Sequence, residues 1–197
     1  DIVDGMRWAV GLAVPGVPAN PNTAKVLNVS LAALGACDSA YQSAIDAVLA
    51  ARVPVIAAAG NNGGNAANYS PANCVGQITV GALDRNGGLP GYGNTGAAVT
   101  LAAPGGIGTG TDAILSTSDS GLTAAVNDHL IAGGNGTSIS TAYVTGIVSL
   151  MQSLKPGLLP VELRNLLVGS VAPFPDAVAM GSPANCNVSL CGAGRAR

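Results

Sequence analysis

A short apolar segment, residues 53–59, runs directly into Gly60-Asn61-Asn62-Gly63-Gly64 and constrains the fold more than any other feature of the chain. Its first residues are β-branched and its last are small, as in a buried strand that another backbone approaches closely. A strand is predicted before it over residues 26–31, and a helix over residues 39–51. Strand, helix and strand in this order favour parallel pairing with a right-handed crossover.

The remaining elements continue this pattern. Helices are predicted over residues 2–12, after Ser138, and from Pro160 to Val168, and strands are predicted near residues 77–82, 99–102 and 113–116. This alternation predicts an α/β fold with three layers, in which helices flank a mostly parallel sheet. A length of 197 residues indicates a single domain over 1–197, and an apolar content of 48% is enough for a sizeable core.

The composition excludes several classes of partner. Only 9% of the residues are charged and the formal net charge is −2, so no basic surface for nucleic acid is expected. The apolar runs are short and broken by Gly, Pro, Asn or charge, so no membrane span is expected either. A nucleotide site at residues 60–64 is disfavoured because neither Gly-x-Gly-x-x-Gly nor a P-loop lysine is present.

The segment Gly136-Thr137-Ser138-Ile139-Ser140 precedes an apolar helical stretch at residues 142–154. It therefore places the Ser138 hydroxyl at a helix start, where free N–H groups and the macrodipole favour developing negative charge. An ordinary helix cap is the simpler interpretation of these residues alone. Asn61, which follows the strand at 53–59, adds a side-chain N–H₂ that could donate to an oxyanion.

Six segments of the chain, in order, resemble those of the subtilisin-like serine proteases, or subtilases. They are residues 26–31, 57–61, 69–72, 78–82, 103–105 and 136–138. The resemblance implies a subtilisin-like fold and a serine endopeptidase that hydrolyses peptide or protein substrates through an acyl-enzyme. It implies that Ser138 is the nucleophile and that the Asn61 side chain and the Ser138 N–H bind the oxyanion. It also implies that the substrate lies along Ser30, Leu31, Ala32, Ala59 and Gly60.

The catalytic Asp and His of this family come before the serine in the chain, and neither of their motifs is present here. The one histidine, His129, lies nine positions before Ser138 in a polar segment, which the resemblance places on a loop or hairpin; it is better explained as a surface residue. We therefore expect the chain to be the Ser-bearing, C-terminal portion of a subtilase catalytic domain. The N-terminal part, carrying Asp and His, would be missing, and the chain alone would be nearly inert. The alternative is a degenerate subtilase, or a fragment, that only binds peptides.

The chain departs from the family pattern at two places. It has Ser30-Leu31-Ala32-Ala33 where subtilases have Ser-Leu-Gly-Gly, and after the nucleophile it lacks the family's proline and histidine, so substrate preference does not carry over. The family can hold structural calcium, but residues 96–99 offer no carboxylates for it. No metal site and no required cofactor are expected.

Four cysteines, Cys37, Cys74, Cys186 and Cys191, allow three disulfide pairings. The resemblance to secreted bacterial subtilases favours Cys37 with Cys74 and Cys186 with Cys191. A zinc site fits less well, because no Cys-x-x-Cys pair is present and histidine is scarce. Disulfides indicate an oxidising compartment, so the chain is expected to be secreted and extracellular.

Overall fold

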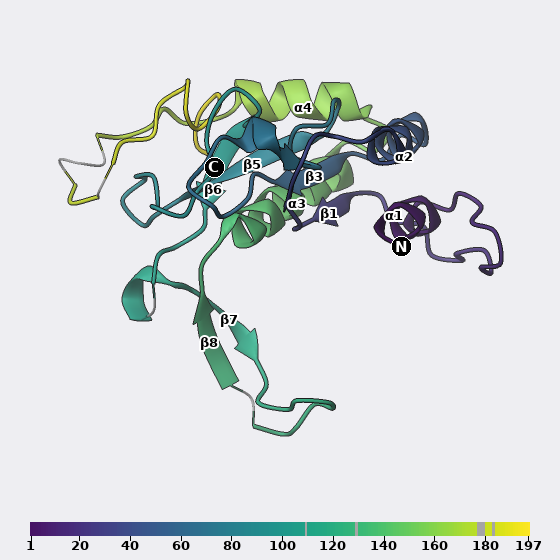
Figure 1. Ribbon diagram of the computed structural model, residues 1–197, viewed down its shortest axis with the longest axis horizontal. Coiled ribbons are helices and arrows are strands. Elements are labelled where there is room, and N and C mark those ends of the chain that lie inside the picture. Colours follow the sequence, from purple (N-terminus) through teal and green to yellow (C-terminus); the bar gives the residue numbers. More distant parts are fainter. Residues whose placement is uncertain (109, 129, 177–179, 183) are drawn as a thin grey trace.

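A four-stranded parallel sheet in the order β1-β3-β5-β6 forms the centre of the protein (Figure 1). The computed structural model describes residues 1–108, 110–128, 130–176, 180–182 and 184–197. The strands of this sheet are Leu27–Val29 (β1), Val55–Ala58 (β3), Ile78–Leu83 (β5) and Leu101–Pro104 (β6). The predicted α/β fold, with a mostly parallel sheet flanked by helices, is confirmed.

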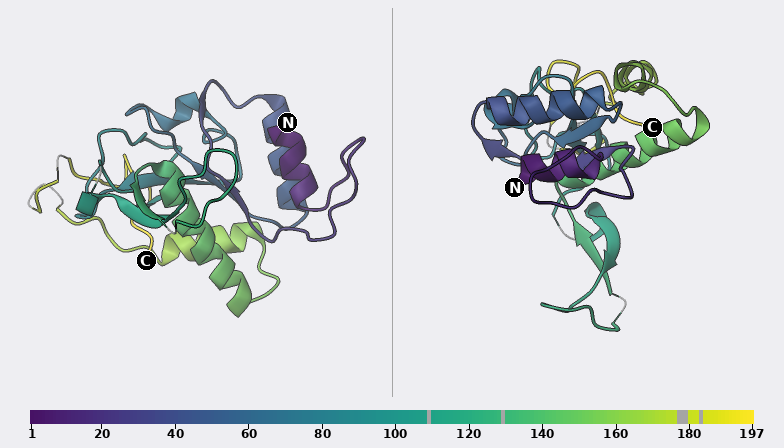
Figure 2. Two further views of the ribbon diagram at one scale, coloured as in Figure 1. Left: turned by 90° about the horizontal axis from the view of Figure 1, so that it is seen from below. Right: turned by 90° about the vertical axis from the view of Figure 1, so that its right-hand side faces the viewer.

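Two helices, α2 (Ser39–Ala50) and α3 (Thr137–Leu154), cover opposite faces of the sheet (Figures 1 and 2). Val55 of β3 packs in a cluster with residues of α2, whereas the next residue, Ile56, packs with Val144 of α3. Successive side chains of a strand point to opposite faces, so β3 is buried from both sides. This explains why residues 53–59 form a continuous apolar run.

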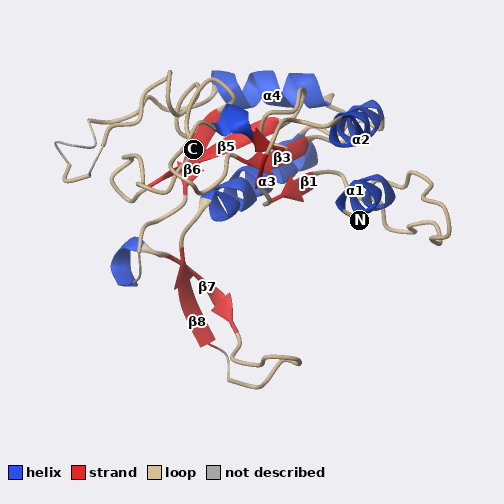
Figure 3. Cartoon of the chain, in the orientation of Figure 1, coloured by secondary structure: helices blue, strands red, loops and turns tan. Residues whose placement is uncertain are grey.

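Two further helices complete these clusters (Figure 3). Helix α1 (Ile2–Ala9) adds Met6 to the cluster of α2, and helix α4 (Pro160–Gly169) adds Leu163 and Leu167 to the cluster of α3. All four helices that the sequence predicts are therefore present, with boundaries that differ by up to three residues at the end of α1. Two short 3-10 helices, Ala66–Asn68 (η1) and Gly110–Asp112 (η2), lie in the connections.

A β-hairpin connects the central sheet to α3 and projects from the body of the protein (Figures 1 and 3). It consists of the antiparallel strands Ile114–Ser118 (β7) and Leu130–Gly134 (β8). The first of these strands is predicted from the sequence, and the resemblance implied a loop or hairpin for the second. A small antiparallel pair, Ala33–Leu34 (β2) with Tyr69–Ser70 (β4), was not predicted.

The cysteines form the two disulfides that the resemblance favours, Cys37–Cys74 and Cys186–Cys191. The first joins the residue before the N-cap of α2 to the segment that precedes β5 and so closes a sequence separation of 37 residues. The second closes a separation of only 5 residues near the end of the chain. The pairing prediction is confirmed.

The last residues of the chain lie beside β6. The Ala102 N–H donates to the Gly194 carbonyl (3.0 Å), and the Ala196 N–H donates to the Ala102 carbonyl (2.8 Å). Backbone pairing of this kind orders a segment without any periodic side-chain pattern. The end of the chain is therefore ordered by its pairing with β6.

Candidate active site

Ser138 is the second residue of α3 and lies at the carboxyl end of β1. Its hydroxyl donates a hydrogen bond to the Ser30 carbonyl (3.2 Å), and the Ser30 hydroxyl donates to the Ser138 carbonyl (2.9 Å). Ser30 directly follows β1, and Ser138 itself is half-buried. The carboxyl ends of parallel strands are where α/β proteins commonly bind ligands.

The first turn of α3 leaves one N–H group without a partner. The Thr137 N–H donates to Asn61 Oδ1 (2.8 Å), and the N–H groups of Ile139 and Ser140 turn back to the Gly136 carbonyl. The Ser138 N–H, by contrast, has no hydrogen-bond acceptor among the residues that the structure describes. A free N–H at a helix start is a donor for an anion.

The Asn61 carboxamide is fixed beside this N–H. Its Oδ1 atom accepts from the Thr137 N–H and from the Thr137 hydroxyl, each at 2.8 Å, and these two donors define which end of the amide is oxygen. Its Nδ2 atom finds no acceptor in the described part of the chain. A Cβ at Gly136, where φ is 142°, would lie 3.3 Å from this nitrogen, so glycine gives the carboxamide its room.

The loop that carries Asn61 is organised by Asn94, whose side chain is 1% exposed. Asn94 Oδ1 accepts from the N–H groups of Asn62 (3.0 Å) and Gly64 (2.9 Å), and Asn94 Nδ2 donates to the Ala59 carbonyl (2.9 Å). One buried carboxamide therefore pairs three backbone groups of this loop. The sequence analysis did not identify Asn94, which lies about thirty residues from its partners in the chain.

Tyr92 braces the other side of the helix start. Its hydroxyl accepts from the Gly136 N–H (3.1 Å) and shares its proton between the carbonyls of Gly105 (2.9 Å) and Gly106 (2.7 Å). Burial raises the pKa of Tyr92 to about 12; the Gly136 hydrogen bond lowers it somewhat, and the nearby Asp84 raises it. The tyrosine therefore stays protonated and continues to donate well above neutral pH.

The predicted substrate-binding residues fall into two groups. Ser30, Ala32, Ala59 and Gly60 lie together: a Cβ on Gly60 would be 3.3 Å from the Ala32 Cβ, and Ala59 is fully buried behind them. Leu31 is 48% exposed and lines a depression against α1. Contact of these five residues with a substrate remains a prediction.

A groove of about 700 Å³ opens beside Ser138, between α3 and the hairpin formed by β7 and β8. Its walls are mostly apolar and include Ile114, Leu115, Ile139 and Tyr143. Apolar walls with a few polar groups at one end are typical of a binding site. Neither Asn61 nor a residue of β1 is among the residues that line this groove.

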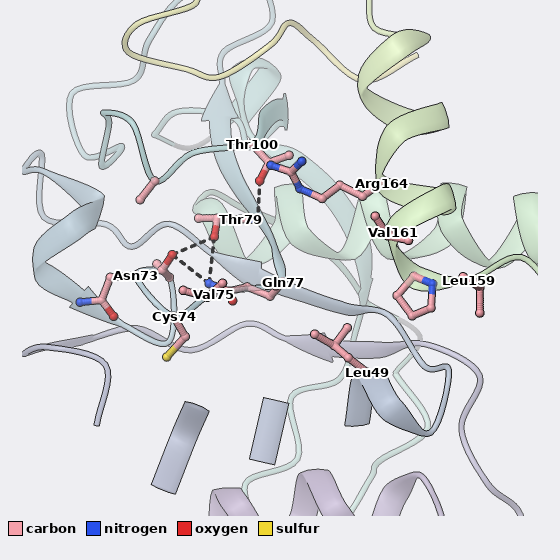
Figure 4. A pocket seen from close by; sticks show the side chains of 14 residues that line it. Leu49, Asn73, Cys74, Val75, Gln77, Thr79, Thr100, Leu159, Val161 and Arg164 are labelled. Atoms are coloured by element: carbon pink, nitrogen blue, oxygen red, sulfur yellow. Dashed lines mark hydrogen bonds between the residues drawn. The ribbon is translucent and has the colours of Figure 1, made fainter. Parts of the chain in front are cut away.

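A second groove, of about 650 Å³, lies at the other end of the sheet's strands, away from Ser138 (Figure 4). Gln77 and Thr100, which line it, directly precede β5 and β6, so the groove is at the amino ends of these parallel strands. Arg164 of α4 reaches over it toward Thr100 (Figure 4). This groove contains neither Ser138 nor Asn61 and is separate from the candidate active site.

No base for Ser138 is found in the described part of the chain. His129 lies outside the described residues, and the hydrogen-bond acceptor of Ser138 Oγ is a carbonyl rather than a carboxylate or imidazole.

Among the residues described, no three acidic, histidine or cysteine side chains gather in a way that could hold a metal ion. None of the helices in those same ranges has both the length and the apolar character needed to cross a membrane.

A model of the subtilase family matches residues 1–189 of this chain. The chain is 37% identical over 195 residues to an extracellular protease of Xanthomonas campestris, covering 98% of this chain and 31% of that protein. It is 35% identical over 178 residues to an extracellular basic protease of Dichelobacter nodosus, covering 88% of this chain and 28% of that protein.

Solved structures show the same similarity. A protease from Pseudoalteromonas arctica superposes with a TM-score of 0.89 at 36% identity, covering 99% of this chain and 55% of that one. A cold-adapted subtilisin-like serine proteinase gives a TM-score of 0.69 at 27% identity, covering 93% of this chain and 59% of that one. The fold is therefore subtilisin-like. The chain spans about a third of the length of the curated relatives and somewhat over half of the solved ones.

Proposed function

The chain belongs to the subtilase family, and on this basis we propose that its parent protein is a serine endopeptidase that cleaves peptide bonds through an acyl-enzyme. In this proposal Ser138 attacks the carbonyl, and Asn61 Nδ2 and the Ser138 N–H bind the oxyanion that forms. The observation that carries the proposal is the orientation of Asn61: Thr137 holds its oxygen, so its nitrogen is available to donate beside Ser138.

The attack requires a base that the described residues do not supply. The hydroxyl proton of Ser138 now lies toward the Ser30 carbonyl, an amide oxygen too weakly basic to remove it. A histidine oriented by a carboxylate performs this step in serine proteases. We assign both residues to a part of the parent polypeptide outside residues 1–197, because this chain covers only 55% and 59% of the two solved relatives.

Two surfaces are suited to bind that further part. Among the residues that the structure describes, the one strand that pairs with β1 in the central sheet is β3, so the outer edge of β1 presents unpaired backbone groups. On α3, Tyr143, Leu150 and Leu154 form an apolar stripe with exposed fractions of 46%, 66% and 87%. These residues are seven and four positions apart, so they lie on one face of the helix, and an exposed apolar face indicates a surface that another element covers. A segment seated there could extend into the groove beside Ser138 and bring its histidine to the hydroxyl.

The substrate class in this proposal is an extended peptide. Ser30 and Ala32 follow β1 at the carboxyl end of the sheet, next to Ser138 and Gly60. An extended peptide binds such an edge by main-chain hydrogen bonds, and side-chain pockets add selectivity. The methyl group of Ala32 fills space that glycine leaves open in the family motif, so the preferred side chains are not inferred from relatives.

Secretion and independence from a cofactor are part of the same proposal. The two disulfides fit an oxidising compartment, and the two curated relatives described above are named extracellular. Acyl transfer by a serine nucleophile needs no cofactor. The parent protein is therefore expected in the culture medium with no free thiol from this chain, as measured by thiol titration of the unfolded protein.

A fluorophosphonate probe tests the catalytic assignment. We expect labelling at Ser138 when the parent protein is used, and none for residues 1–197 alone. Ser138→Ala should abolish labelling. Ser153→Ala, whose hydroxyl binds only within the far end of the same helix, should leave it intact. A folded parent protein that the probe does not label would favour the alternative, a subtilase that binds peptides without cleaving them.

A further inference from the structure

Four side-chain hydrogen bonds lie next to Ser138, and three of them join the β1 segment to α3. The Thr145 hydroxyl shares its proton between Asn28 Oδ1 (3.0 Å) and the Thr141 carbonyl of its own helix (2.9 Å). Asn28 Nδ2 donates to the Ser30 hydroxyl (2.8 Å), and the Ser30 hydroxyl donates to the Ser138 carbonyl (2.9 Å). The fourth bond runs from the Ser138 hydroxyl to the Ser30 carbonyl (3.2 Å). We call Asn28, Ser30, Ser138 and Thr145 the β1–α3 brace.

The regular geometry of both elements aligns the brace. Asn28 and Ser30 are two residues apart in an extended segment, so their side chains lie on the same face of the sheet. Ser138 and Thr145 are seven residues apart, or about two turns, and so lie on the same side of α3. Asn28 therefore connects Thr145, in the third turn of the helix, to Ser30, which binds Ser138 in the first turn.

The brace acts on the side of the helix start that Asn61 and Tyr92 do not hold. Gly136, the N-cap of α3, provides no side-chain hydrogen bond, and Asn61 Oδ1 instead accepts from the N–H of Thr137. Those two residues fix the backbone before Ser138, and the brace fixes the carbonyl of Ser138 itself. Position and direction of the nucleophile are thus set from two sides.

Asn28 is not in a catalytic position. It is exposed in an edge strand, and its two polar atoms contact Thr145 and Ser30 rather than the Ser138 hydroxyl. Any influence on catalysis must therefore act through Ser30 and the Ser138 carbonyl. Small displacements of a nucleophile reduce its rate strongly, because the reacting atoms must be held within a narrow range of distance and direction.

We propose that Asn28 is a positioning residue, which through the Ser30 hydroxyl and the Ser138 carbonyl holds the Ser138 hydroxyl in line with the pocket formed by Asn61. The expected effect of Asn28 on the acylation rate rests on the proposed function. Its expected effect on the order of α3 does not. The brace orders the first two turns of α3, and in the active parent protein it raises the acylation rate without contributing to substrate affinity.

The kinetic test uses the parent protein with the variants Asn28→Ala and Thr145→Val. Both should lower kcat and the fluorophosphonate inactivation rate by about 10- to 100-fold while KM stays within about threefold, because alignment rather than binding is lost. Thr145→Ser, which keeps the hydroxyl, should restore most of the rate. A loss that instead appears only in KM would overturn the proposal.

Asn20→Ala provides a matched control. Asn20 is also a carboxamide near the surface that braces a loop, here to the Trp8 and Ala9 carbonyls of α1. Its Oδ1 also accepts from the Asn22 N–H, so this variant should lose three hydrogen bonds with no change in the inactivation rate. If Asn20→Ala and Asn28→Ala slow inactivation equally at equal melting temperatures, a positioning role for Asn28 is ruled out.

Amide hydrogen exchange separates this proposal from the proposed function. In Asn28→Ala, exchange should become faster in the first two turns of α3 and stay unchanged in α4, whether or not the probe labels the protein. If the parent protein shows this exchange pattern but is not labelled by the fluorophosphonate, the brace is supported and the catalytic assignment of Ser138 is refuted. Unchanged exchange in α3 would refute the brace.

Discussion

Asn61 and Thr137, which are 76 positions apart in the chain, form two hydrogen bonds of 2.8 Å, in which the Thr137 N–H and hydroxyl both donate to Asn61 Oδ1. This pair ties the end of β3 to the start of α3. Because Asn61 Oδ1 accepts both hydrogen bonds, Asn61 Nδ2 is the atom of the carboxamide that remains to donate near Ser138. The same contact therefore stabilises the helix start and prepares an oxyanion donor.

Replacing Asn61 by Ala in the parent protein is predicted to lower kcat by about 10²–10³-fold with a smaller change in KM. That magnitude is the one established for subtilisin itself, because a single donor to the oxyanion acts mainly in the transition state. Steady-state kinetics on a peptide substrate measure it. Asn62→Ala, at the next exposed position of the same loop, should remain within a few fold of the wild type; equal losses in the two variants would contradict the role of Asn61.

Replacing Asn94 by Ala is predicted to reduce the free energy of unfolding by roughly 2–4 kcal/mol, because three backbone groups of this loop lose their hydrogen-bond partner. Urea unfolding of residues 1–197 measures this loss. Asn22→Ala, at an exposed position, should change the free energy of unfolding by less than about 0.5 kcal/mol. A loss below about 1 kcal/mol for Asn94→Ala would show that water replaces the carboxamide.

The elements of this fold were predictable because their signals are local and periodic. The buried strand at 53–59, the helix over 39–51 and the serine at the start of a helix are all visible in consecutive residues. The disulfide pairing needed the family resemblance, since three pairings fit the sequence. The convergence of Ser138 and Asn61 also followed from the resemblance rather than from any pattern in the residues.

The contacts that hold the site in place were not predictable. Asn94 and Tyr92 stand in a glycine-rich loop and bind backbone groups far away in the chain, and Asn28 pairs with Thr145 across 117 positions. Such hydrogen bonds depend on the tertiary fold and leave no periodic trace in the sequence.

The stability of the protein is predicted to fall in alkaline solution through Tyr92. Its pKa is about 12 in the folded protein and about 10 in an unfolded chain, so the folded state holds the proton more tightly. The resulting contribution is complete below about pH 10 and is lost as the pH rises toward 12. For a half-buried group, solvent screening limits the effect to about 1–2 kcal/mol.

Tyr92→Phe provides the comparison. Its free energy of unfolding should be lower than that of the wild type at about pH 9, by about 1 kcal/mol for the lost hydrogen bonds. This difference should shrink between about pH 10 and about pH 12, because only the wild type loses stability through this titration. A difference that stays constant or widens over that range would contradict the assignment; urea unfolding at each pH measures it.

The two disulfides are predicted to contribute unequally to stability. Closing the separation of 37 residues between Cys37 and Cys74 restricts the unfolded chain by roughly 3–4 kcal/mol, whereas closing the separation of 5 between Cys186 and Cys191 restricts it by only about 2 kcal/mol. Urea unfolding of the two double alanine variants compares these contributions. A larger loss for the Cys186 and Cys191 variant would show that contacts near the chain end, not loop closure, dominate.

The structure of the phosphonylated parent protein tests most directly whether Ser138 and Asn61 form one site. We predict that the phosphorus is bonded to Ser138 Oγ and that one phosphonyl oxygen lies about 2.7–3.1 Å from both Asn61 Nδ2 and the Ser138 backbone nitrogen. An adduct on another residue, or an oxygen directed away from Asn61, would contradict the account.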